Sequence, residues 1–102
     1  MDTKATEGTK RTKTTVLRLR LYVAGNAPNS LRAIDNLKTI CAEELLAGHE
    51  LEIVDLLKFP MRALADGIIV TPTLLKLSPL PVQRVIGNLS DTTQVLLALA
   101  NR

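Results

Sequence analysis

The stretch that decides the fold runs from Val70 to Asp91 and reads VTPTLLKLSPLPVQRVIGNLSD. Residues 73–77 and 82–86 are short runs dominated by aliphatic side chains, a pattern that predicts two strands. Between them, residues 78–81 read Ser-Pro-Leu-Pro, which predicts a turn because proline cannot donate a hydrogen bond to a sheet ladder. We therefore expect two strands joined by a tight turn.

The end of this stretch predicts the start of a last helix. Gly87 breaks the second strand, and Ser90 is the expected N-cap with Asp91 in the first turn. Apolar residues then recur at helical spacing and define the expected inner face of this helix: Val95, Leu96 and Leu99.

The N-terminal half predicts a strand, a helix and a second strand. Residues 16–23, VLRLRLYV, alternate between a wholly apolar face and a mixed one, which is the period of a strand. A helix is expected from Ser30 to about Leu46, capped by Asn29 or Ser30, and residues 51–56 predict a second strand parallel to the first. The expected buried stripe of the helix is Leu31, Ile34, Leu37, Cys41 and Leu45. A short helical stretch around residues 61–65 follows.

Length and composition predict a single α/β domain. The chain has 102 residues, a formal net charge of +3 and one cysteine, so it cannot form an internal disulfide. Residues 1–15 are rich in Thr and Lys and predict a disordered basic tail, and residues 16–102 form the expected domain. A solvated tail is favoured over a nucleic-acid-binding one, because no aromatic residue interleaves the charges. No membrane span or signal peptide is recognisable, so we expect a cytoplasmic protein.

The predicted order is strand, helix, strand, short helix, strand, strand, helix, and it resembles the thioredoxin layout. Thr71-Pro72-Thr73 stands where thioredoxins carry a proline, usually cis, that faces their redox pair. The Cys-x-x-Cys position between the first strand and the first helix is occupied by Asn26-Ala27-Pro28-Asn29. The resemblance therefore implies a thioredoxin-like frame in which Asn26 and Asn29 replace the two reactive cysteines.

Longer strings resemble one family more closely, the KaiB family of the cyanobacterial circadian clock. The strings are LYVAGNAPNSLRAIDNL, IVDLLKFP, TPTLLKLSPLPVQRVIGNLSD and QVLLAL, and they cover about residues 16–99. The motif around Gly87 is part of the third string and implies a structural role for that glycine. Several positions depart from the usual family pattern; among them, Glu52 replaces a lysine in the second strand and Ala98 replaces a frequent glycine in the last segment.

The resemblance implies a non-enzymatic adaptor that binds a hexameric KaiC-like ATPase and regulates circadian or stress-related signalling. It further implies a KaiA-like protein or a sensor histidine kinase as additional partners. Family members also switch between this fold and a resting fold that is often tetrameric, so self-association as a dimer or tetramer is implied as well.

Three basic residues match positions that KaiB-type proteins keep on or near their partner-binding face. These residues are Arg32, Lys76 and Arg84. A cationic surface would speed association with an acidic ATPase ring more than it would tighten it. A solvated basic patch without a partner explains the same three residues equally well.

Chemical sites find little support in the sequence. Cys41 lies on the apolar stripe of the first helix, which favours a core residue over a reactive thiol. His49 lacks neighbours at metal-ligand spacing, and Glu50 and Glu52 share one strand face without a nucleophile nearby. We expect no cofactor and no metal. The alternative from another class is a thioredoxin-fold redox or thiol-sensing protein that uses Cys41 alone.

Overall fold

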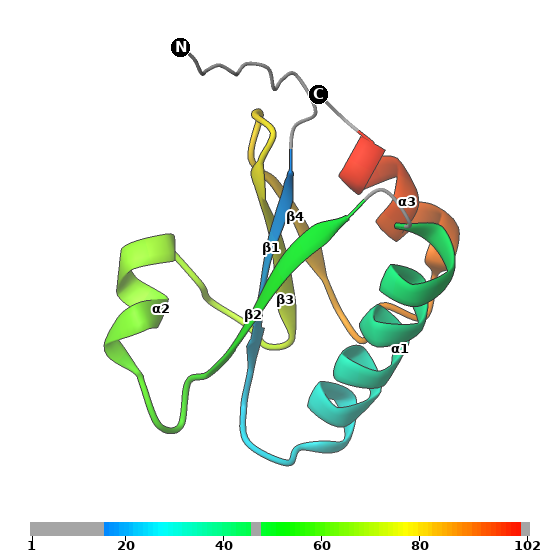
Figure 1. Cartoon of the computed structure of the whole chain (residues 1–102). Helices are drawn as coiled ribbons and strands as arrows, with labels where there is room; N and C mark the ends of the chain where they lie inside the picture. Colours follow the sequence, from blue (N-terminus) through cyan, green and yellow to red (C-terminus); the bar gives the residue numbers. More distant parts are fainter. Residues whose placement is uncertain (1–15, 46–47, 101–102) are drawn as a thin grey trace, which may run out of the picture.

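The protein is a three-layer α/β domain, seen here in a computed structural model that describes residues 16–45 and 48–100. Its elements follow the predicted order, and their bounds are β1 Leu17–Val23, α1 Pro28–Glu44, β2 His49–Asp55, α2 Met61–Asp66, β3 Thr73–Ser78, β4 Gln83–Ile86 and α3 Thr92–Ala100 (Figure 1). The thioredoxin-like element order predicted from the sequence is confirmed. The predicted tail, residues 1–15, lies outside the described residues.

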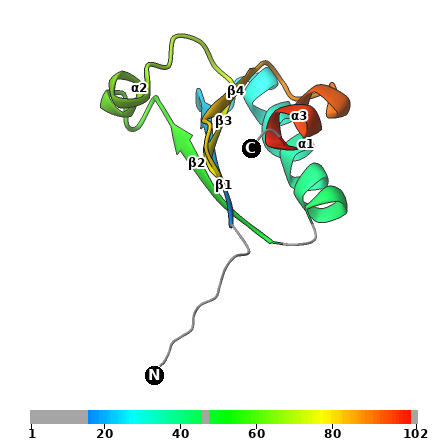
Figure 2. The same cartoon turned by 90° about the horizontal axis from the view of Figure 1, so that it is seen from above.

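The sheet has four strands in the order β2-β1-β3-β4. The β1–β2 pair is parallel, as the strand–helix–strand pattern predicted, and the β1–β3 and β3–β4 pairs are antiparallel. Figure 2 shows α1 and α3 on one side of the sheet and α2 on the other. We call the side under α1 and α3 the packed face, and the side toward α2 the open face.

Strand β1 builds both faces because its side chains alternate. Leu19, Leu21 and Val23 are buried on the packed face, where the main core cluster also takes in residues of α1, β3, β4 and α3. Arg18, Arg20 and Tyr22 point to the open face, and only Tyr22 of the three is buried. The open face therefore has a much smaller core, which consists of Tyr22, Val54 and Leu75.

Helix α1 begins two residues earlier than predicted and has no side-chain cap. Pro28 occupies its first turn, where the missing N–H of a proline costs no hydrogen bond. The Ser30 hydroxyl instead accepts a hydrogen bond from the Ala24 N–H at 3.0 Å, which ties the β1–α1 loop to the helix. The predicted stripe was wrong at Leu31, which is exposed, because Ala33 and Ile40 take the inward positions.

The last helix is capped by Asp91 rather than by Ser90. The Asp91 carboxylate accepts a hydrogen bond from the Gln94 N–H at 3.1 Å, in the manner of an N-cap residue. Val95 and Leu99 are buried and Leu96 packs against the core, as predicted. No helix in the described part of the chain combines the length and the hydropathy that crossing a bilayer requires.

Candidate functional site

The loop that stands where a redox pair would lie is built from amides and backbone contacts. Asn26 and Asn29 are both exposed, and the Asn29 side chain accepts a hydrogen bond from Arg32 at 3.2 Å. The Asp55 carboxylate accepts hydrogen bonds from the N–H groups of Gly25 and Leu57, each at 2.9 Å, and these bonds hold the pKa of Asp55 below its usual value. The loop is thus fixed in place but carries no nucleophile.

The Thr71-Pro72 peptide bond is cis, as the thioredoxin resemblance implied, and Pro72 directly precedes β3 and is buried. Its carbonyl oxygen accepts a hydrogen bond from the Gly87 N–H at 3.0 Å. Gly87 has a φ of 115°, a backbone region that side-chain-bearing residues rarely adopt. Both residues therefore shape the junction between β3 and the end of β4.

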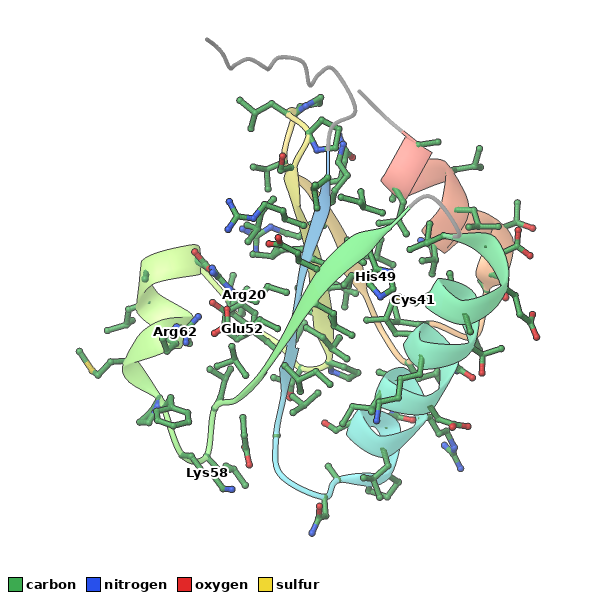
Figure 3. The ribbon with its side chains drawn as sticks, in the orientation of Figure 1. Arg20, Cys41, His49, Glu52, Lys58 and Arg62 are labelled. Carbon is green, nitrogen blue, oxygen red and sulfur yellow. The ribbon has the colours of Figure 1, made fainter. Side chains whose placement is uncertain are left out.

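Cys41 is buried within α1, on the packed face. Burial raises the pKa of its thiol above the usual value, which lowers the fraction of reactive thiolate at neutral pH. Figure 3 places Cys41 and the exposed His49 away from the residues labelled near α2. Among residues 16–45 and 48–100, no group of three His, Cys, Asp or Glu side chains is arranged to hold a metal ion.

The three basic residues predicted to share a binding face do not share one. Lys76 is only 1% exposed, so the prediction that it lies on an accessible surface is wrong for this fold. The register pairs Lys76 with Leu19, which puts it on the packed face, whereas Arg84 pairs with Leu75 of the open face. Arg32 is exposed on α1, and Arg84 donates to the backbone carbonyls of Asp66 and Gly67 at 2.9 and 3.2 Å.

A different surface, which the sequence analysis did not single out, gathers many of the exposed apolar side chains in one segment of the chain. Six of the thirteen large apolar residues exposed in the described part of the chain fall between residues 57 and 70. We define the α2 surface as five of them: Leu57, Phe59, Met61, Leu64 and Ile69. Phe59, the only phenylalanine of the chain, is 56% exposed, and Ile69 is 94% exposed. Solvent-exposed apolar groups gathered in one segment are typical of a protein-binding surface.

The α2 surface surrounds a shallow, mainly apolar hollow. The hollow is lined by Lys58, Phe59, Pro60, Met61, Arg62 and Ala65, and has a volume of about 440 Å³. Aromatic and methionine side chains are enriched at protein interfaces, where they fill pockets of the partner or accept its anchors. Lys58 and Arg62 give the rim a positive charge, which suits a partner with acidic groups.

A network of polar side chains connects α2 to the sheet beneath this surface. We call it the α2 clamp, and its members are Arg20, Tyr22, Glu52, Arg62 and Asp66. Arg20 donates to Glu52 at 2.7 Å and to Asp66 at 2.9 Å. Arg62 donates to both carboxylate oxygens of Glu52, at 3.0 and 3.1 Å. The hydroxyl of Tyr22 donates to the Asp66 carboxylate. Figure 3 shows Arg20, Glu52 and Arg62 meeting between β2 and α2.

Protonation equilibria in the clamp follow from these contacts. The hydrogen bond from Tyr22, helped by Arg20, holds the pKa of Asp66 below its usual value, and Arg62 does the same for the pKa of Glu52. Burial and the bond to Asp66 raise the pKa of Tyr22. At neutral pH the clamp is therefore two carboxylates, two guanidiniums and a neutral phenol. The sequence predicted that Glu50 and Glu52 share a strand face, and they do, each opposite an arginine of β1.

The comparisons with known proteins agree on one family. The KaiB domain model matches residues 20–100. The circadian clock oscillator protein KaiB of Synechococcus elongatus is 52% identical over 81 residues, which is 79% of this chain and 79% of that protein. The KaiB of Gloeothece citriformis is 51% identical over 81 residues, covering 79% of this chain and 76% of that protein.

A solved structure supports the same fold. The N-terminal domain of Synechococcus elongatus SasA, determined in solution, matches with a TM-score of 0.70 over 91% of this chain and 90% of that domain. Its sequence identity is 24%, so the likeness concerns the fold. These comparisons confirm the family resemblance and the thioredoxin-like fold that the sequence predicted.

Proposed function

Because the chain belongs to the KaiB family, we propose that it is a non-enzymatic adaptor that regulates a hexameric KaiC-like ATPase by docking onto it. The observation that carries this proposal is the exposed α2 surface on a domain whose redox positions are Asn26 and Asn29. Such a chain offers a partner-binding surface without a nucleophile. Circadian or stress-related signalling in the cytoplasm is the setting that the family resemblance favours.

The docking contact is proposed to centre on Phe59, Met61 and Leu64. Apolar anchors at the centre of an interface carry most of its binding free energy, and charged groups at the rim mainly set orientation and association rate. Arg84 and Lys58 lie beside this surface and supply such a rim, while Arg32 belongs to a second, separate contact. Lys76 is left out of the proposed interface because it is buried in this fold.

The proposal extends to competition with other clock proteins. A sensor histidine kinase whose domain has the same fold would compete for the same ATPase surface. A KaiA-like protein is proposed to be captured by the assembled complex rather than by this chain alone.

The redox alternative is less well supported by the geometry. A thiol-based sensor needs an accessible thiolate, and Cys41 is buried with a raised pKa. We therefore propose that Cys41 is a core residue.

The test compares two leucines of matched exposure on opposite sides of the sheet. Leu64 on α2 is 74% exposed, and Leu97 on α3 is 69% exposed. We expect Leu64→Ala to weaken binding to the purified KaiC-like ATPase of the same organism at least about tenfold, because it removes a central anchor. Leu97→Ala should leave the dissociation constant within about twofold. Biolayer interferometry with ATP or ADP on the ring would measure both.

An equal loss for the two leucine variants would show that the α2 surface is not the docking site. No binding of the unaltered protein to any KaiC-like ATPase of the organism, in either nucleotide state, would contradict the adaptor proposal itself.

A further inference from the structure

Helix α2 is attached to the domain in a different way from α1 and α3. Helix α1 buries Ala33, Leu37, Ile40 and Cys41, and α3 buries Val95 and Leu99. Helix α2 buries none of its six residues. The small core of the open face ends at Leu56 and Ile68, on either side of α2. Apolar burial therefore fixes the two ends of the segment but not the helix between them.

Polar contacts, in place of buried apolar side chains, hold helix α2 against the sheet. The two α2 residues that reach the sheet are Arg62 and Asp66, and both belong to the clamp. Arg20 bridges Asp66 of α2 and Glu52 of β2, so one guanidinium joins three elements. The Arg20 and Asp66 side chains are 24% and 22% exposed, so this pair is better shielded from water than an ordinary surface ion pair. Arg84 adds its hydrogen bonds to the carbonyls at the end of the helix.

We infer that the α2 clamp positions the docking surface, so that breaking the clamp releases α2 locally while the rest of the domain stays folded. The consequence for docking rests on the proposed function, whereas the release of α2 does not. Proteins open in local units whose free energies lie below that of global unfolding, and a helix without buried side chains is such a unit.

The clamp then controls the apparent affinity of the adaptor. A partner that recognises α2 in its clamped position binds only the fraction of molecules in which α2 is in place. Once the clamp is broken, that fraction falls and the apparent dissociation constant rises in inverse proportion to it. Regulation by ionic strength follows as well, since the exposed Arg62–Glu52 pair is weakened by salt.

The chain offers a matched control for this inference. Arg18 and Glu50 form an ion pair at 3.2 Å on the same face and between the same two strands, two residues along each strand from Arg20 and Glu52. Neither residue contacts α2 through a hydrogen bond or ion pair of the described structure. Glu50→Gln therefore removes an equivalent charge without touching the clamp.

The experiment measures amide hydrogen exchange by NMR on the full chain, in the unaltered protein and in two variants. In Tyr22→Phe combined with Glu52→Gln, we expect the amides of Gly67 and Ile68, which donate to Leu64 and Ala63, to exchange about tenfold faster than in the unaltered protein. Amides of β1 and β3 should keep their exchange rates within about twofold. The Glu50→Gln variant should match the unaltered protein at both places.

Two results would overturn the inference: unchanged exchange at Gly67 and Ile68, or a uniform acceleration across β1, β3 and α2. The uniform acceleration would mean that the clamp contributes to global stability instead of holding α2. Faster exchange at α2 with no binding of any KaiC-like ATPase would support the role of the clamp and contradict only the proposed function. Unaltered exchange at α2 with normal ATPase binding would contradict the role of the clamp and support the proposed function.

Discussion

The two faces of the sheet differ in how their side chains are packed and exposed. On the packed face, apolar side chains of β1, β3 and β4 meet those of α1 and α3 in one continuous cluster. On the open face, three buried residues are followed outward by arginines, carboxylates and exposed apolar groups. One strand, β1, supplies both faces by alternation.

This difference teaches where stability and binding are located. Buried apolar area contributes roughly 25 cal/mol per Å², so most of the folding free energy comes from the packed face. Exposed apolar side chains contribute little to folding and remain available to a partner. The α2 surface, which a polar clamp holds in position, can therefore move or be substituted with little effect on the stability of the core.

The largest expected effect tests the division directly. Leu21 is fully buried in the middle of β1 on the packed face. Leu21→Ala should lower the free energy of unfolding by about 2–5 kcal/mol, because it removes buried methyl groups and leaves a cavity. Leu64→Ala on the open side should change it by less than about 0.5 kcal/mol. Urea denaturation followed by circular dichroism would measure both.

The comparison between the faces would fail if the two leucine substitutions cost similar amounts of stability. Such a result would mean that α2 is part of the cooperative core.

Local patterns in the sequence predicted most of the fold. The alternation of residues 16–23 identified β1 and its apolar face, and the Ser-Pro-Leu-Pro run at residues 78–81 identified the turn between β3 and β4. The strands and helices all appear where predicted, with ends that coincide or differ by one or two residues. These features depend on neighbours in the chain, so a single sequence contains enough information to predict them.

The features that the sequence did not predict depend on residues far apart in the chain. Asp66 and Arg20 are 46 positions apart, and nothing local in either segment indicates that they form a pair. Lys76 was expected on or near the partner-binding face because it matches a basic position of KaiB-type proteins. In the structure the first four residues of β3, Thr73 to Lys76, are buried on both faces of the sheet, so Lys76 is buried although it is charged.

The α2 surface was missed for a related reason. The residues from Leu57 to Ile69 have the apolar character of a core segment, and only the fold shows that nothing in the described part of the chain covers them. Phe59 illustrates the point, since the only phenylalanine of a chain is an expected core residue.

A second prediction concerns the one lysine that the packed face encloses. A buried ammonium pays a desolvation cost even when it has a partner, and an apolar side chain of similar length pays none. We expect Lys76→Met to keep the free energy of unfolding within about 2 kcal/mol of the unaltered protein, because relief of the desolvation cost offsets the contacts that the ammonium gives up. The exposed Lys38 of α1 provides the control, since Lys38→Met should change stability by less than about 0.5 kcal/mol.

A loss of stability larger than about 2 kcal/mol in Lys76→Met would show that the ammonium makes contacts that the packed face depends on. The packed face would then be partly polar in its energetics, and the contrast between the two faces would be weaker than the burial pattern indicates.

The smallest expected effect asks whether the packed face has a competing arrangement. The family resemblance implies a second fold in which the last segment is a strand, and here that segment is helix α3 with Ala98 packed against the core. Ala98→Gly should cost the helical form about 1 kcal/mol, because glycine is the poorer helix former. A strand disfavours alanine and glycine alike, so the second fold should gain about fivefold in relative population. Ala42→Gly, at an exposed position of α1, should lower stability by a similar amount without favouring the second fold, since Ala42 lies outside the segment expected to become a strand. NMR chemical shifts of residues 91–100 and size-exclusion elution would distinguish the two variants.

Strand-like shifts and earlier elution in Ala98→Gly alone would show that the packed face can adopt a second arrangement in which α3 is a strand. Identical behaviour of the two variants would show that a single substitution does not populate a strand form of α3.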